Sequence, residues 1–142
     1  MKIFLDTNFL LRYYLKDNQQ QFEDCKELIL QIEEGKFRVY TSSIVFLEIS
    51  YVLKSVYKLP FSDITEVLDS ILTIRGITIV DKTNTKIALQ FYKKYKVKFT
   101  DCLIASQLPK NTILVSFDEE LSKIKEIEVK DPLADVLTRV KE

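Results

Sequence analysis

Four acidic residues, Asp6, Glu48, Asp101 and Asp118, have types and positions that suit metal-dependent chemistry. Asp6 and Asp118 each follow a short apolar, β-favouring run, so we expect them at the carboxyl ends of strands, the edge where open α/β sheets bind ligands. Asp101 opens a short helix. Carboxylates gathered at such an edge repel one another unless a cation is present, and oxygen ligands suit a hard cation, Mg²⁺ or Mn²⁺.

Glu48 is the most informative of the four, because it lies within about 60° of the centre of the apolar face of its predicted helix. An unpaired ionised carboxylate there is costly, so it must meet a cation, a base or water. A salt bridge to Lys or Arg would explain Glu48 alone. Asp101 alone is explained by a favourable charge in a first helical turn, Asp118 by an N-cap and Asp6 by an Asx-turn. The coincidence of all four favours one common site.

Residue types that are rare or missing exclude several classes of enzyme. There is no histidine, which excludes Ser-His-Asp triads, Cys-His nucleophiles and His-ligated zinc. Cys25 and Cys102 have no CxxC spacing, which favours a reduced, cytoplasmic setting over a zinc or disulfide framework. With only Gly35 and Gly76, neither GxGxxG nor a P-loop occurs.

The length of 142 residues, with 21 acidic and 21 basic side chains, predicts one soluble globular domain spanning residues 1–142. No apolar run approaches 18 residues and the N-terminus lacks a signal-peptide pattern. We therefore expect no membrane association and a cytoplasmic location.

The elements that must position the acids alternate between strand and helix patterns, which predicts an α/β three-layer sandwich with a central parallel five-stranded sheet. The expected strands are Ile3–Leu5, Arg38–Thr41, Ile77–Val80, Thr112–Ser116 and a last one from Ile127. The expected helices are Asn8–Leu15, Gln19–Glu34, Ser43 to about Tyr57, one from Ser62 or Asp63 to Gly76, Asn84–Tyr95, one from Thr100 to Pro109, Glu119–Ile124 and an amphipathic tail from Pro132.

The ordered motifs resemble a known family. FLDTN around Asp6, an apolar helix containing Glu48, TDCLIA around Asp101 and a strand ending in SFD at Asp118 resemble the PIN domain, in particular the VapC-type toxin ribonucleases of prokaryotic toxin–antitoxin pairs. The resemblance covers essentially the whole chain. It implies the sheet order 3-2-1-4-5 and Mg²⁺- or Mn²⁺-dependent cleavage of RNA, with these four acids as catalytic, metal-site residues.

The same resemblance implies supporting polar roles for Asn8 and for Ser116, which stands where the pattern often has Thr. Arg12 and Lys16 follow the first acid on its helix, so we expect them to contact substrate phosphates. The expected partners are RNA, a cognate antitoxin protein and a second copy of the chain in a homodimer. Exposed Leu and Tyr side chains on the first four helices are candidates for these protein interfaces.

Two alternative functions remain open at this stage. A haloacid-dehalogenase-like phosphatase also begins with a strand and an Asp, but it needs a second Asp two residues on, where this chain has Asn8. A PIN-like RNA-processing or RNA-binding module without a toxin role would carry the same motifs. Lysines between residues 93 and 98, interleaved with aromatic residues, could follow an RNA backbone, although a solvated helix end explains them better.

Overall fold

A five-stranded parallel sheet with the order β3-β2-β1-β4-β5 forms the centre of the computed structural model, which describes residues 1–132. The parallel sheet and its order confirm the fold prediction. The strands are β1 (Lys2–Leu5), β2 (Arg38–Ser42), β3 (Ile77–Val80), β4 (Thr112–Val115) and β5 (Glu128–Lys130).

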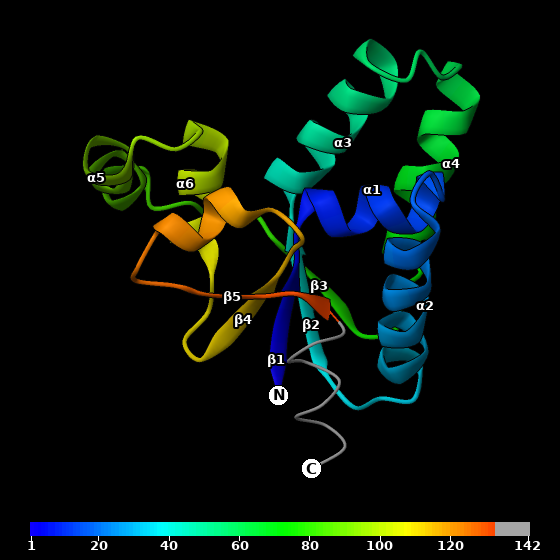
Figure 1. Ribbon diagram of the computed structural model, residues 1–142, viewed down its shortest axis with the longest axis horizontal. Coiled ribbons are helices and arrows are strands. Elements are labelled where there is room, and N and C mark those ends of the chain that lie inside the picture. The colour runs from blue at the N-terminus through cyan, green and yellow to red at the C-terminus, as the bar shows by residue number, and fades with distance from the viewer. Residues whose placement is uncertain (133–142) are drawn as a thin grey trace.

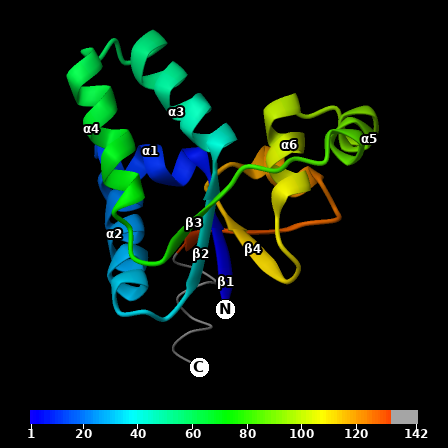
Figure 2. The ribbon, with the colours of Figure 1, turned by 180° about the vertical axis from the view of Figure 1, so that it is seen from behind.

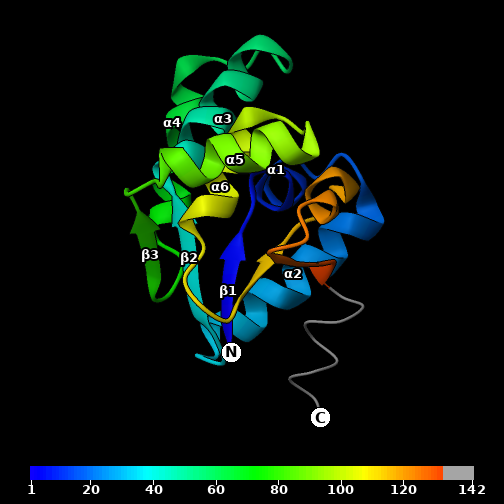
Figure 3. The same ribbon diagram turned by 90° about the vertical axis from the view of Figure 1, so that its left-hand side faces the viewer.

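Helices cover both faces of this sheet. They are α1 (Thr7–Leu15), α2 (Gln19–Glu33), α3 (Ser43–Ser55), α4 (Phe61–Leu72), α5 (Thr85–Tyr95), α6 (Phe99–Gln107) and the 3-10 helix η1 (Glu119–Lys123). Helices α1, α2 and α4 lie on one side of the sheet and α5 and α6 on the other (Figures 1 and 2), which confirms the three-layer arrangement. The carboxyl ends of β1 and β2 point towards α1, α3 and α6 (Figure 3).

Strand β1 occupies the middle of the sheet because its residues can be buried on both faces. Ile3, Phe4 and Leu5 are all fully buried, as expected for the central strand of a parallel sheet covered by helices. Strand β4 pairs with β1 in a register that sets Leu5 opposite Val115. The Asp6 N–H donates to the Val115 carbonyl at 3.2 Å, so the ladder continues to the first acid.

The structure moves several element boundaries by one or two residues. The largest change is in α4, which ends at Leu72 rather than at Gly76, because the N–H groups of Thr73 and Ile74 donate to carbonyls three residues back instead of four. Helix α1 begins at Thr7, so Asp6 takes the N-cap position, yet its side chain makes no capping hydrogen bond. Helix α3 ends at Ser55, two residues before the expected end at about Tyr57, and Val56 is 65% exposed. The tail helix predicted from Pro132 lies outside the described residues.

Two further sequence expectations concern the cysteines and the membrane. Cys25 and Cys102 are both buried and free, as expected for a chain without a disulfide framework. Over residues 1–132, no helix is long and apolar enough to cross a bilayer.

Candidate active site

A cleft of about 140 Å³ at the carboxyl edge of the sheet brings the four predicted acids together. They arrive from four elements: the end of β1, helix α3, the first turn of α6 and the segment after β4. The lining residues are Asp6, Thr7, Asn8, Leu11, Glu48, Val52, Lys98, Asp101 and Asp118. Positions far apart in the sequence therefore share one small, anionic cleft.

Asp6 is held at the base of this cleft by its neighbour across the sheet. Its side chain is 3% exposed, and Oδ2 accepts a hydrogen bond from the Ser116 hydroxyl at 2.7 Å. Burial raises the pKa of Asp6 to about 6, against the lowering effect of Ser116, and the charge of Glu48 adds to the rise. Ser116 can reach Asp6 because Leu5 and Val115 are paired in adjacent strands.

The carboxyl group of Asp101 is perturbed more strongly than that of Asp6. Its pKa is raised to about 7, first by burial and then by the negative charges of Asp6, Glu48 and Asp118, while Lys98 lowers it. Its Oδ2 is buried and has no hydrogen-bond partner. An ionised oxygen in that position is costly unless something positive binds it.

Glu48 is half-buried on α3, and its Oε1 accepts a hydrogen bond from the Thr7 hydroxyl at 2.7 Å. Glu48 forms no ion pair with any of residues 1–132, so the alternative of a salt bridge to Lys or Arg is wrong for the described part of the chain. Thr7 lies in the first turn of α1, directly after Asp6. Its hydroxyl therefore connects α3 to the turn that carries the first acid.

Asp118 both caps a short helix and lines the acidic cleft. Its Oδ1 accepts from the Glu120 N–H at 2.9 Å, which confirms the N-cap alternative, while the residue also lines the acidic cleft. Its own N–H donates to the Ser116 hydroxyl oxygen at 3.0 Å. Ser116 thus ties the turn after β4 to Asp6, because its hydroxyl donates to one acid and accepts from the backbone of the other.

The chemistry of the cleft fits a hard divalent cation. Its four acidic side chains offer carboxylate oxygens, the metal ligands that Mg²⁺ and Mn²⁺ prefer. Two buried oxygens, Asp101 Oδ2 and Asn8 Oδ1, have no hydrogen-bond partner. In the described part of the chain, no three acids already stand close enough to enclose an ion. The site is therefore an open, mutually repelling set of carboxylates rather than a closed cage.

The two predicted phosphate contacts do not line this cleft. Arg12 Nη1 donates to both carboxylate oxygens of Asp17 at 2.7 Å, and its Nη2 lies 3.4 Å from the Tyr57 hydroxyl. Lys16 Nζ lies 5.2 Å from the centre of the Phe22 ring, in a different groove. The substrate role of both residues stays a prediction without support from their positions.

The cleft also contains Thr7 and Lys98, which the sequence does not single out as site residues. Thr7 is recognisable there only as a helix-capping residue type, and its contact with Glu48 depends on how α3 packs against α1. Lys98 is one of four neighbouring lysines. Its only distinguishing signal is its place three residues before Asp101, at the N-cap position of α6.

We expect the Ser116→Ala substitution to lower the rate of the expected RNA cleavage by about tenfold. It should also move the acid limb of the pH–activity profile to higher pH. The substitution removes a hydrogen bond that favours the ionised form of Asp6, so the pKa of Asp6 rises further. Ser116→Thr keeps the hydroxyl and is the matched control. A profile unchanged in Ser116→Ala would show that this hydrogen bond does not control the Asp6 carboxylate.

Comparison with known proteins shows the family of this chain. The PIN domain family model matches residues 3–127, and the chain belongs to the PIN domain family. A VapC ribonuclease from Aquifex aeolicus (strain VF5) is 27% identical over 122 residues, which cover 84% of this chain and 90% of that protein.

Two solved structures show the same fold at low sequence identity. VapBC2 from Rickettsia felis, bound to a DNA fragment from its promoter, contains a chain that matches with a TM-score of 0.67 and 21% identity, over 92% of this chain and 98% of that one. PAE2754 from Pyrobaculum aerophilum matches with a TM-score of 0.66 and 14% identity, over 99% and 90% of the two chains.

Proposed function

We propose that this protein is a Mg²⁺- or Mn²⁺-dependent endoribonuclease that hydrolyses RNA phosphodiester bonds. The observation that carries the proposal is the convergence of Asp6, Glu48, Asp101 and Asp118 on one cleft, with a buried Asp101 oxygen that lacks a partner. Membership of the PIN domain family and similarity to a VapC ribonuclease support the same reaction. The family assignment disfavours the phosphatase alternative.

In this proposal the four acids would hold the cation, which when bound lowers the pKa of a water ligand and offsets charge that builds on the phosphate. Ser116 orients Asp6 through its 2.7 Å hydrogen bond, and Thr7 orients Glu48 in the same way. The apolar side chain of Leu11 forms part of the wall of the cleft. In-line attack by water leaves a 5′-phosphate and a 3′-hydroxyl.

Cleavage of a panel of single-stranded and structured RNAs tests the proposed reaction. We expect cleavage with Mg²⁺ or Mn²⁺, none in EDTA, and recovery when excess Mg²⁺ is restored, because the carboxylates alone repel both the phosphate and one another. The products should carry 5′-phosphate ends. Cleavage that persists in EDTA, or products with 2′,3′-cyclic phosphate ends, would contradict metal-dependent hydrolysis.

We further propose that the protein acts in the cytoplasm as the toxin of a toxin–antitoxin pair. VapBC2 from Rickettsia felis binds a DNA fragment from its own promoter, and a corresponding complex here would pair this chain with an antitoxin. A groove of about 640 Å³ between α1, α2 and α4 supports a protein partner. Its lining combines apolar and aromatic residues with both charge signs: Tyr13, Tyr14, Leu15, Lys16, Phe22, Lys26, Leu59, Asp63, Glu66, Val67 and Ser70.

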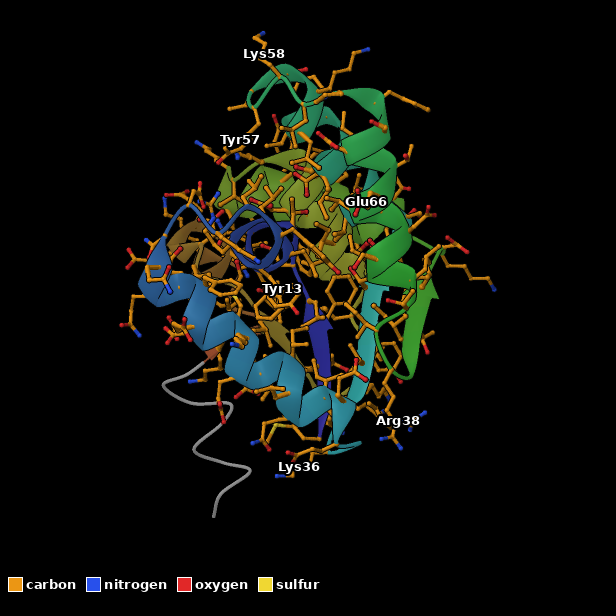
Figure 4. The ribbon with its side chains drawn as sticks, turned by 90° about the vertical axis from the view of Figure 1, so that its right-hand side faces the viewer. Tyr13, Lys36, Arg38, Tyr57, Lys58 and Glu66 are labelled. Carbon is orange, nitrogen blue, oxygen red and sulfur yellow. The ribbon has the colours of Figure 1, made fainter. Side chains whose placement is uncertain are left out.

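Figure 4 looks onto the side of the molecule that carries α2 and α4, with Tyr13 near α2 and Glu66 on α4; both residues line the groove. Its walls offer apolar surface for a helix and charges on both sides to fix its register. A small gene directly upstream that encodes a DNA-binding protein, and co-purification of that protein with this one, would support the pairing. The absence of such a gene, together with the absence of a co-purifying protein, would favour the alternative, a PIN-like RNA-processing module.

A homodimer is also part of the proposal. Leu47 and Tyr51 lie one helical turn apart on α3, and both are more than 60% exposed. Large apolar side chains exposed on one helix face are typical of protein interfaces. Sedimentation of the purified protein at several concentrations distinguishes a dimer from a monomer.

A further inference from the structure

A basic side chain lines the acidic cleft: Lys98, at the N-cap position of α6. Its backbone is fixed on both sides, because Val97 is buried in the small core cluster with Cys102, and the Lys98 carbonyl accepts the Cys102 N–H at 3.2 Å. Three residues further on, Asp101 lies in the same cleft. The start of α6 therefore holds a lysine and an acid in a fixed relation.

Lys98 differs from the basic residues around it. Among residues 1–132 it forms no ion pair, whereas Lys94 lies 3.9 Å from Glu126. Its side chain is exposed, so the ammonium group can meet a ligand from solvent. Lys93 is equally exposed on α5 but does not line the cleft. Position, rather than charge alone, distinguishes Lys98.

The charge of the cleft explains what such a group could do. Four carboxylates exceed the charge of one divalent cation, so the occupied cleft still repels a phosphodiester. The charge of Lys98 already acts on Asp101, but within residues 1–132 its ammonium group is not held in an ion pair. Such a group at the rim offsets this repulsion where the substrate enters. A lysine suits this role because its three donors form a mobile point charge for phosphate oxygens.

We infer that Lys98 binds a phosphate of the RNA substrate at the mouth of the acidic cleft. This inference rests on the proposed ribonuclease function and adds a substrate-binding residue to it. The contact is made to a non-bridging oxygen in both the bound substrate and the transition state. Loss of Lys98 should therefore affect binding and KM more than kcat.

Paired measurements of cleavage and RNA binding test this inference. In Lys98→Gln we expect kcat/KM to fall about tenfold near 0.1 M salt, mainly through KM. For binding to single-stranded RNA, measured in an Asp101→Asn background so that the RNA stays intact, the slope of log K against log salt should become shallower by about 0.7. Lys98→Arg should remain within about threefold of the parent protein.

Lys93→Gln is the matched control, since it removes the same charge from the adjacent helix. If the parent protein cleaves RNA and Lys98→Gln behaves like Lys93→Gln in kcat/KM and in salt slope, the inference about Lys98 is overturned and the ribonuclease assignment stands. If the parent protein neither binds nor cleaves RNA, both are overturned. Circular dichroism of each variant confirms that the exposed substitutions leave the fold intact.

Discussion

Replacing Asp101 by asparagine is expected to reduce RNA cleavage by about a thousandfold or more while making the metal-free protein more stable. Asp101 as a residue is 5% exposed, its Oδ2 has no hydrogen-bond partner, and its pKa is raised to about 7. Asparagine has nearly the same shape without the charge. The loss of a metal-site carboxylate removes several kcal/mol of transition-state stabilisation, whereas the folded protein no longer buries a repelled anion.

The gain in stability should be about 1–3 kcal/mol at pH 8 in EDTA, measured by urea unfolding. Asp69→Asn is the matched control, because Asp69 is exposed on α4 and does not line the cleft. It should change neither activity nor stability by more than about 0.5 kcal/mol. An Asp101→Asn protein that cleaves RNA at the parent rate would remove this residue from the site.

The second large effect is a loss of metal-free stability as the pH rises from about 4 to about 7. Asp6 and Asp101 have pKa values raised from 3.8 to about 6 and about 7 in the folded protein. Well below pH 3.8 both groups are protonated in the folded and unfolded states, so they do not change the free energy of unfolding. As the pH rises from about 4 to about 7, the unfolded chain has released protons that the folded chain still binds, so the free energy of unfolding falls.

We expect this contribution to reach about 2–4 kcal/mol above about pH 8, where both groups are ionised in the folded and the unfolded protein and the effect levels off. The difference in melting temperature between the parent protein and Asp101→Asn, followed from pH 4.5 to 8 in EDTA, isolates the contribution of Asp101 from that of the other acids. Mg²⁺ should stabilise the parent more at pH 8 than at pH 5, because protonated carboxyls do not bind metal. A difference that does not change with pH would contradict the proposed burial of charge.

The sheet and helices were predictable from the sequence because their signals are local. The buried run of β1, its sharp end at Asp6 and the apolar periodicities of the helices each span a few residues. The four acids could be selected from their positions at strand ends, at a helix start and on an apolar helix face. The sheet order needed the family resemblance, since no local pattern says which strands are neighbours. Element boundaries shifted where a single residue decides them, as at Thr7, which joins α1.

The contacts that orient or compete with site residues were not predictable, because they depend on packing between distant elements. Thr7 meets Glu48 only because α3 lies beside the start of α1. Arg12 was expected to contact phosphate, but its guanidinium is occupied within the protein. Helix α1 ends at Lys16, which adopts a left-handed backbone conformation with φ of 55°. The chain then turns so that Asp17 binds the Arg12 guanidinium.

Ser116 illustrates how one small side chain can couple two acids. Its hydroxyl donates to Asp6 and accepts from the backbone N–H of Asp118, so the relative positions of the first and last acid depend on a single oxygen. The apolar pattern of the sequence places Ser116 only at the end of a predicted strand. In the structure it is the link between the edge of the sheet and the turn that carries Asp118.

The central claim is that side chains from four separate elements bind one divalent cation, and a titration with Mn²⁺ followed by electron paramagnetic resonance tests it most directly. At pH 7.5 the parent protein should bind Mn²⁺, and Asp6→Asn and Glu48→Gln should each weaken binding by at least about tenfold, with Asp69→Asn unchanged. Mn²⁺ affinity that is the same in the parent protein and in both cleft variants would contradict the account.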